Sequence, residues 1–285
     1  MSLPETPRRS RVPWVLAVTV GLCSGLAGYV IHVAQTRRIP KQIVQVRRLT
    51  DMAGSEETPA ISPDGTKVAY VAMSGGKRQI RIGAAAITHD DADHFGPRWS
   101  ADSKSLIYFS GGAVWKSPSS RLVDALAPGD LSHAGETLAY FRLRDSAVEL
   151  MAGDHAVVEL PAGDMYSNLR WSPDDKKIAY LMNTNLMVVS VSGGEPVQAA
   201  HMAVQGFAWA PDNSGLIVSR IVSTGGELWF IPRADRDSPF QLTFGELSYE
   251  SPDVSPGGIL VVSRRMVYAS GAAESDIVMF SGLKW

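Results

Sequence analysis

The hydrophobic positions of this chain follow two different patterns, and the first is one continuous apolar run. No Asp, Glu, Lys or Arg occurs from 12 to 36, and residues 13–34 are mainly Val, Leu, Ile, Ala and Gly. As a helix, this stretch would measure about 33 Å, which matches a hydrocarbon core of roughly 30 Å. We therefore predict a transmembrane helix over 13–34, with a short basic cytoplasmic tail over 1–12 and a linker over 35–42. A cleaved signal peptide is the alternative, because a basic region precedes the run.

The second pattern consists of short apolar segments that alternate with turn-forming residues after the linker. A motif recurs among them: a Trp or aliphatic residue, then Ser-Pro-Asp-Gly or a relative, then an apolar strand. Its Ser, or the Ala that replaces it, stands at positions 62, 100, 132, 172, 210 and 255. The mean spacing of about 39 residues is typical of the four-stranded blades of a β-propeller.

Six motifs predict an all-β fold, a six-bladed β-propeller over 43–285 that is closed by its N-terminal strand. Residues 46–50, which precede the first motif, resemble 240–243, which form the expected outer strand before the sixth. The last apolar segment, 276–282, aligns with a third strand. We therefore expect the N-terminal strand to complete the last blade, since closure removes the free sheet edges of an open ring.

The turn of the motif explains four aspartates that look like an acidic set. Pro presets φ and Asp or Gly accepts the turn conformation, so Ser-Pro-Asp-Gly reverses the chain between two strands. We assign a structural role in these turns, through hydrogen bonds to the backbone, to Asp64, Asp102, Asp174 and Asp212. The Trp or aliphatic residue that ends the preceding strand is expected to pack one blade against the next.

The repeated Ser-Pro-Asp-Gly motifs, each followed by a hydrophobic-Ala-Tyr strand, and the Arg-x-Leu-Thr segment at 47–50 resemble TolB-like, WD-repeat-like propellers of bacteria. The resemblance covers essentially all of the chain after the apolar run. It implies a non-enzymatic, extracytoplasmic interaction module. In related architectures a single span connects such a propeller to a cytoplasmic winged helix or protein kinase. Only residues 1–12 precede the span here, so we expect that output domain to be absent.

Composition narrows the classes of function. The chain has 27 Lys and Arg against 29 Asp and Glu, which excludes a polybasic nucleic-acid binder. Its single Cys excludes a disulfide framework and a thiolate metal site. No Gly-x-Ser-x-Gly nucleophile motif occurs. We therefore predict no catalytic residue, no metal ion and no cofactor.

The polar candidates for binding lie in the connections between blades. Residues 89–94 carry two His and three Asp, but their spacing matches no metal template, so a solvated loop is the preferred interpretation. Because these connections are expected on one face of the ring, they could form a rim that binds a basic or polar protein segment. The candidate rim residues are Asp91, Asp93, His94, Tyr166, Tyr249 and Glu250. Ordinary loop polarity is the alternative.

These features predict a single-pass protein of the cell membrane whose propeller lies on the extracytoplasmic side and binds a protein or peptide without catalysis. It would be the sensor or scaffold part of a signalling or envelope system. Two alternatives stay open: a metal-dependent or ligand-binding propeller that uses the channel mouth, and the sensor half of a membrane-bound transcriptional regulator or kinase. Gly21, Gly25 and Gly28 share one helical face, which makes a homodimer through the span possible.

Overall fold

A computed structural model describes residues 45–50, 54–135, 137–223, 225–233, 238–244, 247–267 and 273–283. The regular structure in these ranges consists of strands. None of the described residues forms a helix with the length and apolar character needed to cross a bilayer. The predicted span over 13–34, with Gly21, Gly25 and Gly28, lies outside the described residues, so it stays a prediction.

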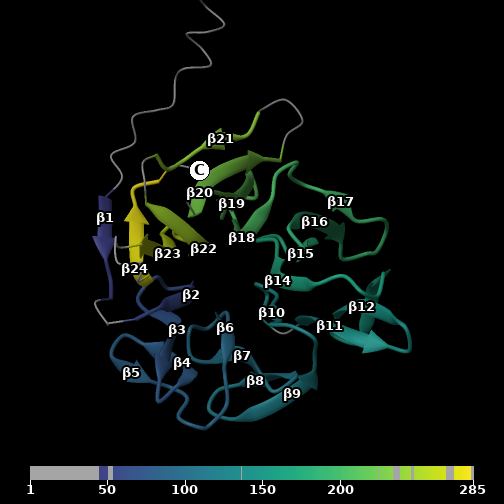
Figure 1. Ribbon diagram of the computed structural model, residues 1–285. Coiled ribbons are helices and arrows are strands. Elements are labelled where there is room, and N and C mark those ends of the chain that lie inside the picture. The colour runs from purple at the N-terminus through teal and green to yellow at the C-terminus, as the bar shows by residue number, and fades with distance from the viewer. Residues whose placement is uncertain are drawn as a thin grey trace, which may run out of the picture. The chain divides into compact units, whose positions relative to one another are not determined.

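The strands form six four-stranded antiparallel sheets arranged as blades around a central channel (Figure 1). From the inner to the outer strand, the first three blades are β2 (Glu56–Ile61), β3 (Val68–Ser74), β4 (Lys77–Ile82) and β5 (Ala85–Ala86); β6 (Phe95–Trp99), β7 (Leu106–Ser110), β8 (Ala113–Lys116) and β9 (Ser120–Asp124); and β10 (Asp130–Leu131), β11 (Leu138–Arg144), β12 (Ala147–Ala152) and β13 (His155–Leu160). The next three are β14 (Tyr166–Trp171), β15 (Lys177–Met182), β16 (Asn185–Ser190) and β17 (Val197–Gln198); β18 (Val204–Trp209), β19 (Gly215–Val222), β20 (Gly225–Pro232) and β21 (Phe240–Gln241); and β22 (Ser248–Val254), β23 (Leu260–Val267), β24 (Ala273–Ser281) and β1 (Gln45–Arg48). The predicted six-bladed propeller is confirmed.

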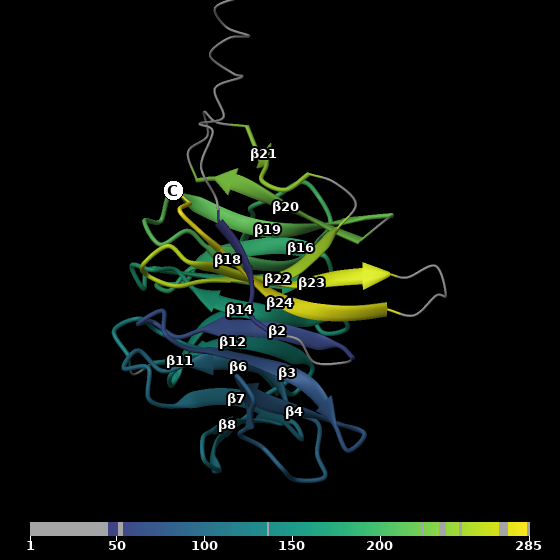
Figure 2. The ribbon, with the colours of Figure 1, turned by 90° about the vertical axis from the view of Figure 1, so that its left-hand side faces the viewer.

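The sixth blade contains strands from both ends of the propeller. The N-terminal strand β1 pairs with β24 in antiparallel register, from Gln45 opposite Ser281 to Arg48 opposite Val278 (Figure 2). Just beyond β1, the Thr50 hydroxyl accepts a 2.8 Å hydrogen bond from the backbone N–H of Ile277. The Thr243 hydroxyl likewise accepts one from the N–H of Leu228 in the fifth blade. The similarity between 46–50 and 240–243 therefore reflects the same local structure, and the predicted closure is confirmed.

The turn between the first two strands of a blade is held by its own side chains. In the first blade, Asp64 accepts hydrogen bonds from the Ser62 hydroxyl at 2.6 Å and from the backbone N–H of Thr66 at 2.9 Å. The Ser62 hydroxyl hydrogen bond is the main reason that the pKa of Asp64 is lowered to about 2. The equivalent carboxylates accept the backbone N–H groups of Lys104, Lys176 and Ser214, at Asp102, Asp174 and Asp212 respectively.

Neighbouring blades are joined by apolar packing and by the Trp residues of the motif. Each of six clusters of buried apolar side chains combines residues from two consecutive blades, including the pair formed by the sixth and first. Three indoles add a directional contact, because each donates a hydrogen bond to a backbone carbonyl of the preceding blade. These bonds run from Trp99 to Ala60, from Trp171 to Asp130 and from Trp209 to Arg170. The expected packing of the motif Trp between blades is confirmed, and its N–H fixes the blade next to it.

Candidate functional site

The inner strands carry an irregularity that sets which side chains face the channel. Antiparallel pairing with the second strand shifts register in the middle of β2, β6, β14, β18 and β22. In four of these strands the shift contains a residue with φ between 47° and 53°, namely Thr58, Gly96, Asn168 and Ser251. A bulge of this kind re-aims the side chains that follow it. The residues two positions on, Ala60, Arg98, Arg170 and Asp253, therefore occupy equivalent places around the channel.

Charged residues occupy four of the six equivalent places. In blade order the position two residues before the turn Ser or Ala holds Ala60, Arg98, Asp130, Arg170, Ala208 and Asp253. All six are buried or nearly so, and the two Arg residues are only 6% and 9% exposed. Two guanidinium groups and two carboxylates therefore face one another inside the ring with no net formal charge. We call these four residues, Arg98, Asp130, Arg170 and Asp253, the channel quartet.

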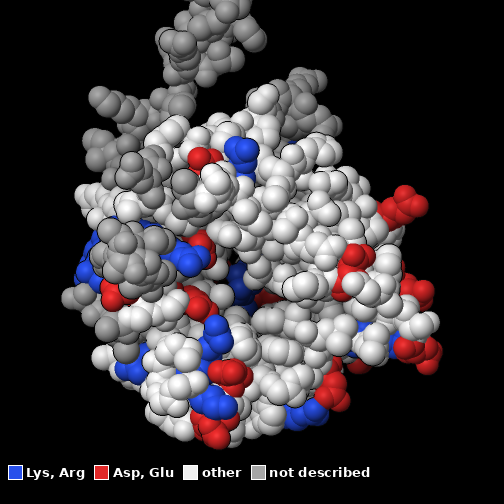
Figure 3. All heavy atoms as spheres, in the orientation of Figure 1, with Lys and Arg blue, Asp and Glu red and all other residues white. Residues whose placement is uncertain are grey.

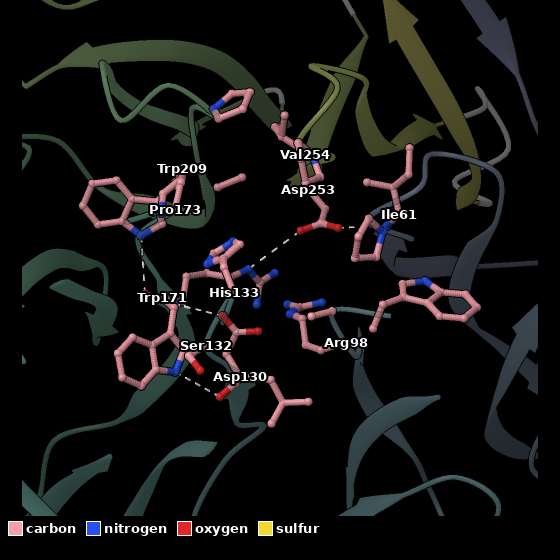
Figure 4. Close-up of a pocket in the computed structure, with 18 residues that line it drawn as sticks. Ile61, Arg98, Asp130, Ser132, His133, Trp171, Pro173, Trp209, Asp253 and Val254 are labelled. Atoms are coloured by element: carbon pink, nitrogen blue, oxygen red, sulfur yellow. Dashed lines mark hydrogen bonds and ion pairs between the residues drawn. The ribbon is translucent and has the colours of Figure 1, made fainter. Parts of the chain in front are cut away.

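The channel quartet lies at the floor of a cavity of about 380 Å³ that opens on the face of the Ser-Pro-Asp turns. Twelve of the eighteen residues around the cavity are apolar, among them the three motif Trp residues and four Pro residues of the turns. A space-filling view shows the ring hollowed at its centre, with charged atoms inside the hollow (Figure 3). Figure 4 shows Arg98, Asp130 and Asp253 pointing toward one another from different blades. The cavity therefore combines an apolar wall with a charged floor.

The two carboxylates of the quartet join blades. Asp130 Oδ2 accepts the backbone N–H of Trp171 at 2.9 Å, and Asp253 Oδ2 accepts the backbone N–H of Ile61 at 2.8 Å. In both cases the donor lies in the next blade around the ring. Burial raises the pKa of Asp130 and that of Asp253 to about 6, with Arg98 opposing the change through its positive charge. The carboxylates are therefore held by structural hydrogen bonds and take up protons just below neutral pH.

The raised pKa values predict a specific pH dependence of stability. In the unfolded chain an Asp titrates near pH 4, so between about pH 4 and 6 the folded state binds more protons than the unfolded state. The contribution of these two groups is greatest below pH 4 and is lost as the pH rises through 6. We expect Asp130→Asn, which keeps an acceptor for the Trp171 N–H, to gain stability relative to the wild type as the pH is raised from 4 to 7. Thermal melts of both proteins at several pH values would measure this, and a constant difference in melting temperature would contradict it.

None of the predicted rim residues lines this cavity. Asp91, Asp93 and His94 lie in the connection before β6, whereas Tyr166, Tyr249 and Glu250 lie in the first residues of the inner strands β14 and β22. Tyr166 is only 8% exposed, donates its hydroxyl hydrogen bond to the carbonyl of Pro161 at 2.6 Å and packs against Phe141 and Tyr180. Tyr249 packs edge-on against Phe280, and half-buried Glu250 lies near Arg265. The structure thus gives both tyrosines packing contacts.

The polar loop over 89–94 is tied to the first blade. His94 is 2% exposed, and its Nε2 lies 2.7 Å from Asp90 Oδ1. Asp93 accepts the backbone N–H of Arg78, while exposed Asp91 pairs with Lys77. Within the described ranges, no group of three or more His, Cys, Asp and Glu side chains is placed to hold a metal ion. The hydrogen bonds of this loop therefore fix its path along β4.

The channel quartet is absent from the residues predicted from the sequence, although the sequence carries a signal for it. When the motifs are aligned on the turn Ser or Ala, the position two residues earlier alternates between Arg, Asp and Ala. By itself this position is simply part of a strand that ends in Trp. A column of opposite charges one position before the Trp or aliphatic residue that ends the inner strand, repeated in different blades, is nevertheless unusual for a strand interior, since ionised groups are rarely buried without partners.

Comparison with known proteins supports the fold and goes no further. The chain matches no protein-family model, and no curated protein matches it. Among solved structures it is similar to a TolB protein of Agrobacterium tumefaciens, with 17% identity over 71% of this chain and 87% of the other and a TM-score of 0.53. It is also similar to an oligogalacturonate lyase of Vibrio parahaemolyticus, with 12% identity over 83% and 82% of the two chains and a TM-score of 0.51.

A third similar structure is the β-propeller domain of Cps50 (Swd1) from Myceliophthora thermophila, with 8% identity over 84% and 86% of the two chains and a TM-score of 0.54. These neighbours include both an enzyme and proteins that are not named as enzymes, so their likeness concerns the fold alone. At that level the sequence prediction is confirmed: the chain has a TolB-like, WD-repeat-like β-propeller fold.

Proposed function

We propose that this protein is a non-enzymatic binding module that takes a segment of another polypeptide into the channel cavity of its propeller. The observation that supports this proposal is the cavity itself. It is concave, about 380 Å³ in volume, and two thirds of the residues around it are apolar, with a few convergent polar groups at its floor. Such a combination is typical of sites that bury part of a ligand and fix its orientation.

The walls of the cavity are preorganised, which favours binding. They consist of inner strands held to the next blade by the indole hydrogen bonds of Trp99, Trp171 and Trp209. A rigid site loses little conformational entropy when a ligand enters it. We propose further that residues 13–34 anchor the propeller to a membrane on the extracytoplasmic side. In that setting the cavity would serve a sensor or scaffold of a signalling or envelope system.

A non-enzymatic role is favoured over catalysis by the use of the two carboxylates. Asp130 and Asp253 each commit an oxygen to a backbone N–H of the next blade, so they serve the closure of the ring. We therefore assign them a structural role and place ligand recognition on the remaining surface of the cavity.

Blocking the cavity is expected to abolish peptide binding. Linear peptides that bind the full chain would first be selected from a displayed peptide library. Their affinity for two variants would then be measured. Ala101 is exposed at the cavity mouth, so Ala101→Trp fills the entrance without disturbing the core. We expect it to weaken binding by at least about tenfold. Ala84→Trp, at an exposed turn of the first blade, is the matched control and should leave binding unchanged. Selected peptides that bind Ala101→Trp as well as the wild type would overturn the proposal.

A further inference from the structure

The cavity floor has more hydrogen-bond donors than acceptors. A guanidinium carries five N–H donors, yet Arg98 and Arg170 each donate from Nη1 only to the carbonyl of the preceding residue. The Nε atoms of both residues are buried and have no hydrogen-bond partner among the residues that the structure describes. A buried donor without a partner destabilises the folded chain, and more so when it is charged. Two such donors in one cavity therefore favour a ligand that brings acceptors.

The carboxylates of the quartet do not supply those acceptors. Asp130 Oδ2 and Asp253 Oδ2 are occupied by the backbone N–H groups of the neighbouring blades. Arg170 Nε lies 3.9 Å from Asp253 Oδ1, which is an ion-pair distance but too long for a hydrogen bond. Among the described residues, Arg98 forms no ion pair within 4 Å. The side chain of Arg98 thus points into the cavity with its charge only partly compensated (Figure 4).

We infer that the cavity binds a carboxylate of its polypeptide ligand, with Arg98 and Arg170 as the hydrogen-bond donors. This inference rests on the proposed function and names the chemical group that the site recognises. Arg matches carboxylates well, because two parallel N–H groups meet two oxygens. A phosphate would fit less well, since its second negative charge would face Asp130 and Asp253, whereas a singly charged carboxylate adds only one.

The source of the carboxylate is an acidic side chain or the C-terminus of a peptide. An acidic sugar is the competing class, but each of its hydroxyl groups needs a polar partner when buried. Beyond the quartet, the polar residues around the cavity are Ser132 and His133, and Trp171 and Trp209 are themselves only 4% and 8% exposed. The mostly apolar wall therefore suits the side chains of a peptide better than a row of hydroxyl groups.

Binding of a carboxylate should be coupled to proton uptake. The charged and titratable groups that face the ligand are Arg98, Arg170, Asp130 and Asp253, with His133 at the mouth beside Asp175. A bound anion raises the pKa of nearby carboxylates further, and by linkage their protonation strengthens anion binding. We therefore expect affinity for an acidic peptide to increase as the pH falls from 7.5 to 5.5.

The test uses three peptides of equal length and the full chain. They are hexaglutamate with an amidated C-terminus, hexaglutamine with an amidated C-terminus and hexaglutamine with a free C-terminus. Binding would be followed by equilibrium dialysis and by the fluorescence of the Trp residues around the cavity. We expect amidated hexaglutamate to bind at least about tenfold more tightly than amidated hexaglutamine. The two hexaglutamines differ only in the C-terminal carboxylate, so tighter binding of the one with a free C-terminus would show that the cavity binds that group rather than a side-chain carboxylate.

Variants connect this binding to the quartet. Arg98→Gln should lower the affinity for the favoured carboxylate peptide by at least about tenfold. Arg98→Lys, which keeps the charge but not the two parallel donors, should recover part of it. Arg121→Gln, on the outer strand of the second blade, is the control for general attraction of an anion and should leave affinity unchanged. Thermal melts of each variant show whether the fold is kept.

The possible results separate the inference from the proposed function. Equal loss of affinity in Arg98→Gln and Arg121→Gln overturns the inference. So does the absence of any preference for a peptide carboxylate, whether on a side chain or at the C-terminus. If display selection still yields cavity-dependent peptides without acidic groups, the proposed function stands alone. If trigalacturonate binds through Arg98 while no peptide does, the recognised group is confirmed but the ligand class, and with it the proposed function, is wrong.

Discussion

Deletion of residues 43–50 is expected to lower the free energy of unfolding by about 3 kcal/mol and the melting temperature by about 6–12 °C. The deletion removes β1, all four of whose residues pair with β24. It also removes the Thr50 hydroxyl that accepts the Ile277 N–H. Asp276, only 1% exposed, would lose its ion pair with Arg48 and keep the one with Arg264. Each of these contacts contributes a modest amount, and together they close the ring.

Two deletions make the measurement specific. Removal of residues 1–42 leaves β1 in place, so its melting temperature serves as the reference for the shorter deletion of 43–50. Denaturant unfolding of both proteins gives the free energies directly. If the two proteins unfold at the same temperature and the same denaturant concentration, the pairing of β1 with β24 contributes nothing to stability. A second, earlier transition in the 43–50 deletion would show that the open sixth blade unfolds separately.

The blades could be predicted from the sequence because their information is local and repeated. The turn residues, the Trp at the end of the inner strand and the apolar second strand lie within a few positions of one another. Even the closure, which joins opposite ends of the chain, could be inferred, because Leu49 and Thr50 repeat the roles of Leu242 and Thr243. A contact between residues far apart in the chain can be inferred from the sequence when its residues repeat those of a contact within a single blade.

The cavity could not be found in the same way, because it depends on backbone geometry. Three of the four charged side chains lie two positions after a residue with positive φ, which is Ser251 in the sixth blade, and Thr58 takes the same conformation in the first blade. Thr and Ser rarely adopt this conformation, so nothing in the sequence marks them. His94 and Tyr166 show the opposite: the sequence suggested exposed polar positions, but His94, just before β6, and Tyr166, at the start of β14, are buried against Tyr108 and Phe141.

Both the packing of the second blade against the third and the candidate site depend on Gly96. The substitution Gly96→Ala is expected to lower the free energy of unfolding by about 3 kcal/mol. Its φ of 53° lies in the left-handed region, which an Ala adopts only at a cost of about 1–2 kcal/mol. A Cβ there would lie 2.7 Å from both Cβ and Cγ of Pro128, in the connection to the third blade. A proline ring cannot rotate away, so the blades must shift apart. Arg98 follows two residues later and would move with the strand.

The matched control for this substitution is Gly83→Ala. Gly83 has a φ of 56°, nearly that of Gly96, but nothing lies within 4 Å of the place that a Cβ would take there. It therefore bears the conformational cost alone, about 1 kcal/mol, and Gly96→Ala should be less stable than it by about 2 kcal/mol. Gly96→Ala should also bind hexaglutamate more weakly, while Gly83→Ala should bind it as the wild type does. Equal unfolding free energies for the two variants would mean that the second and third blades accommodate the methyl group. The contact between Gly96 and Pro128 would then not fix the position of Arg98.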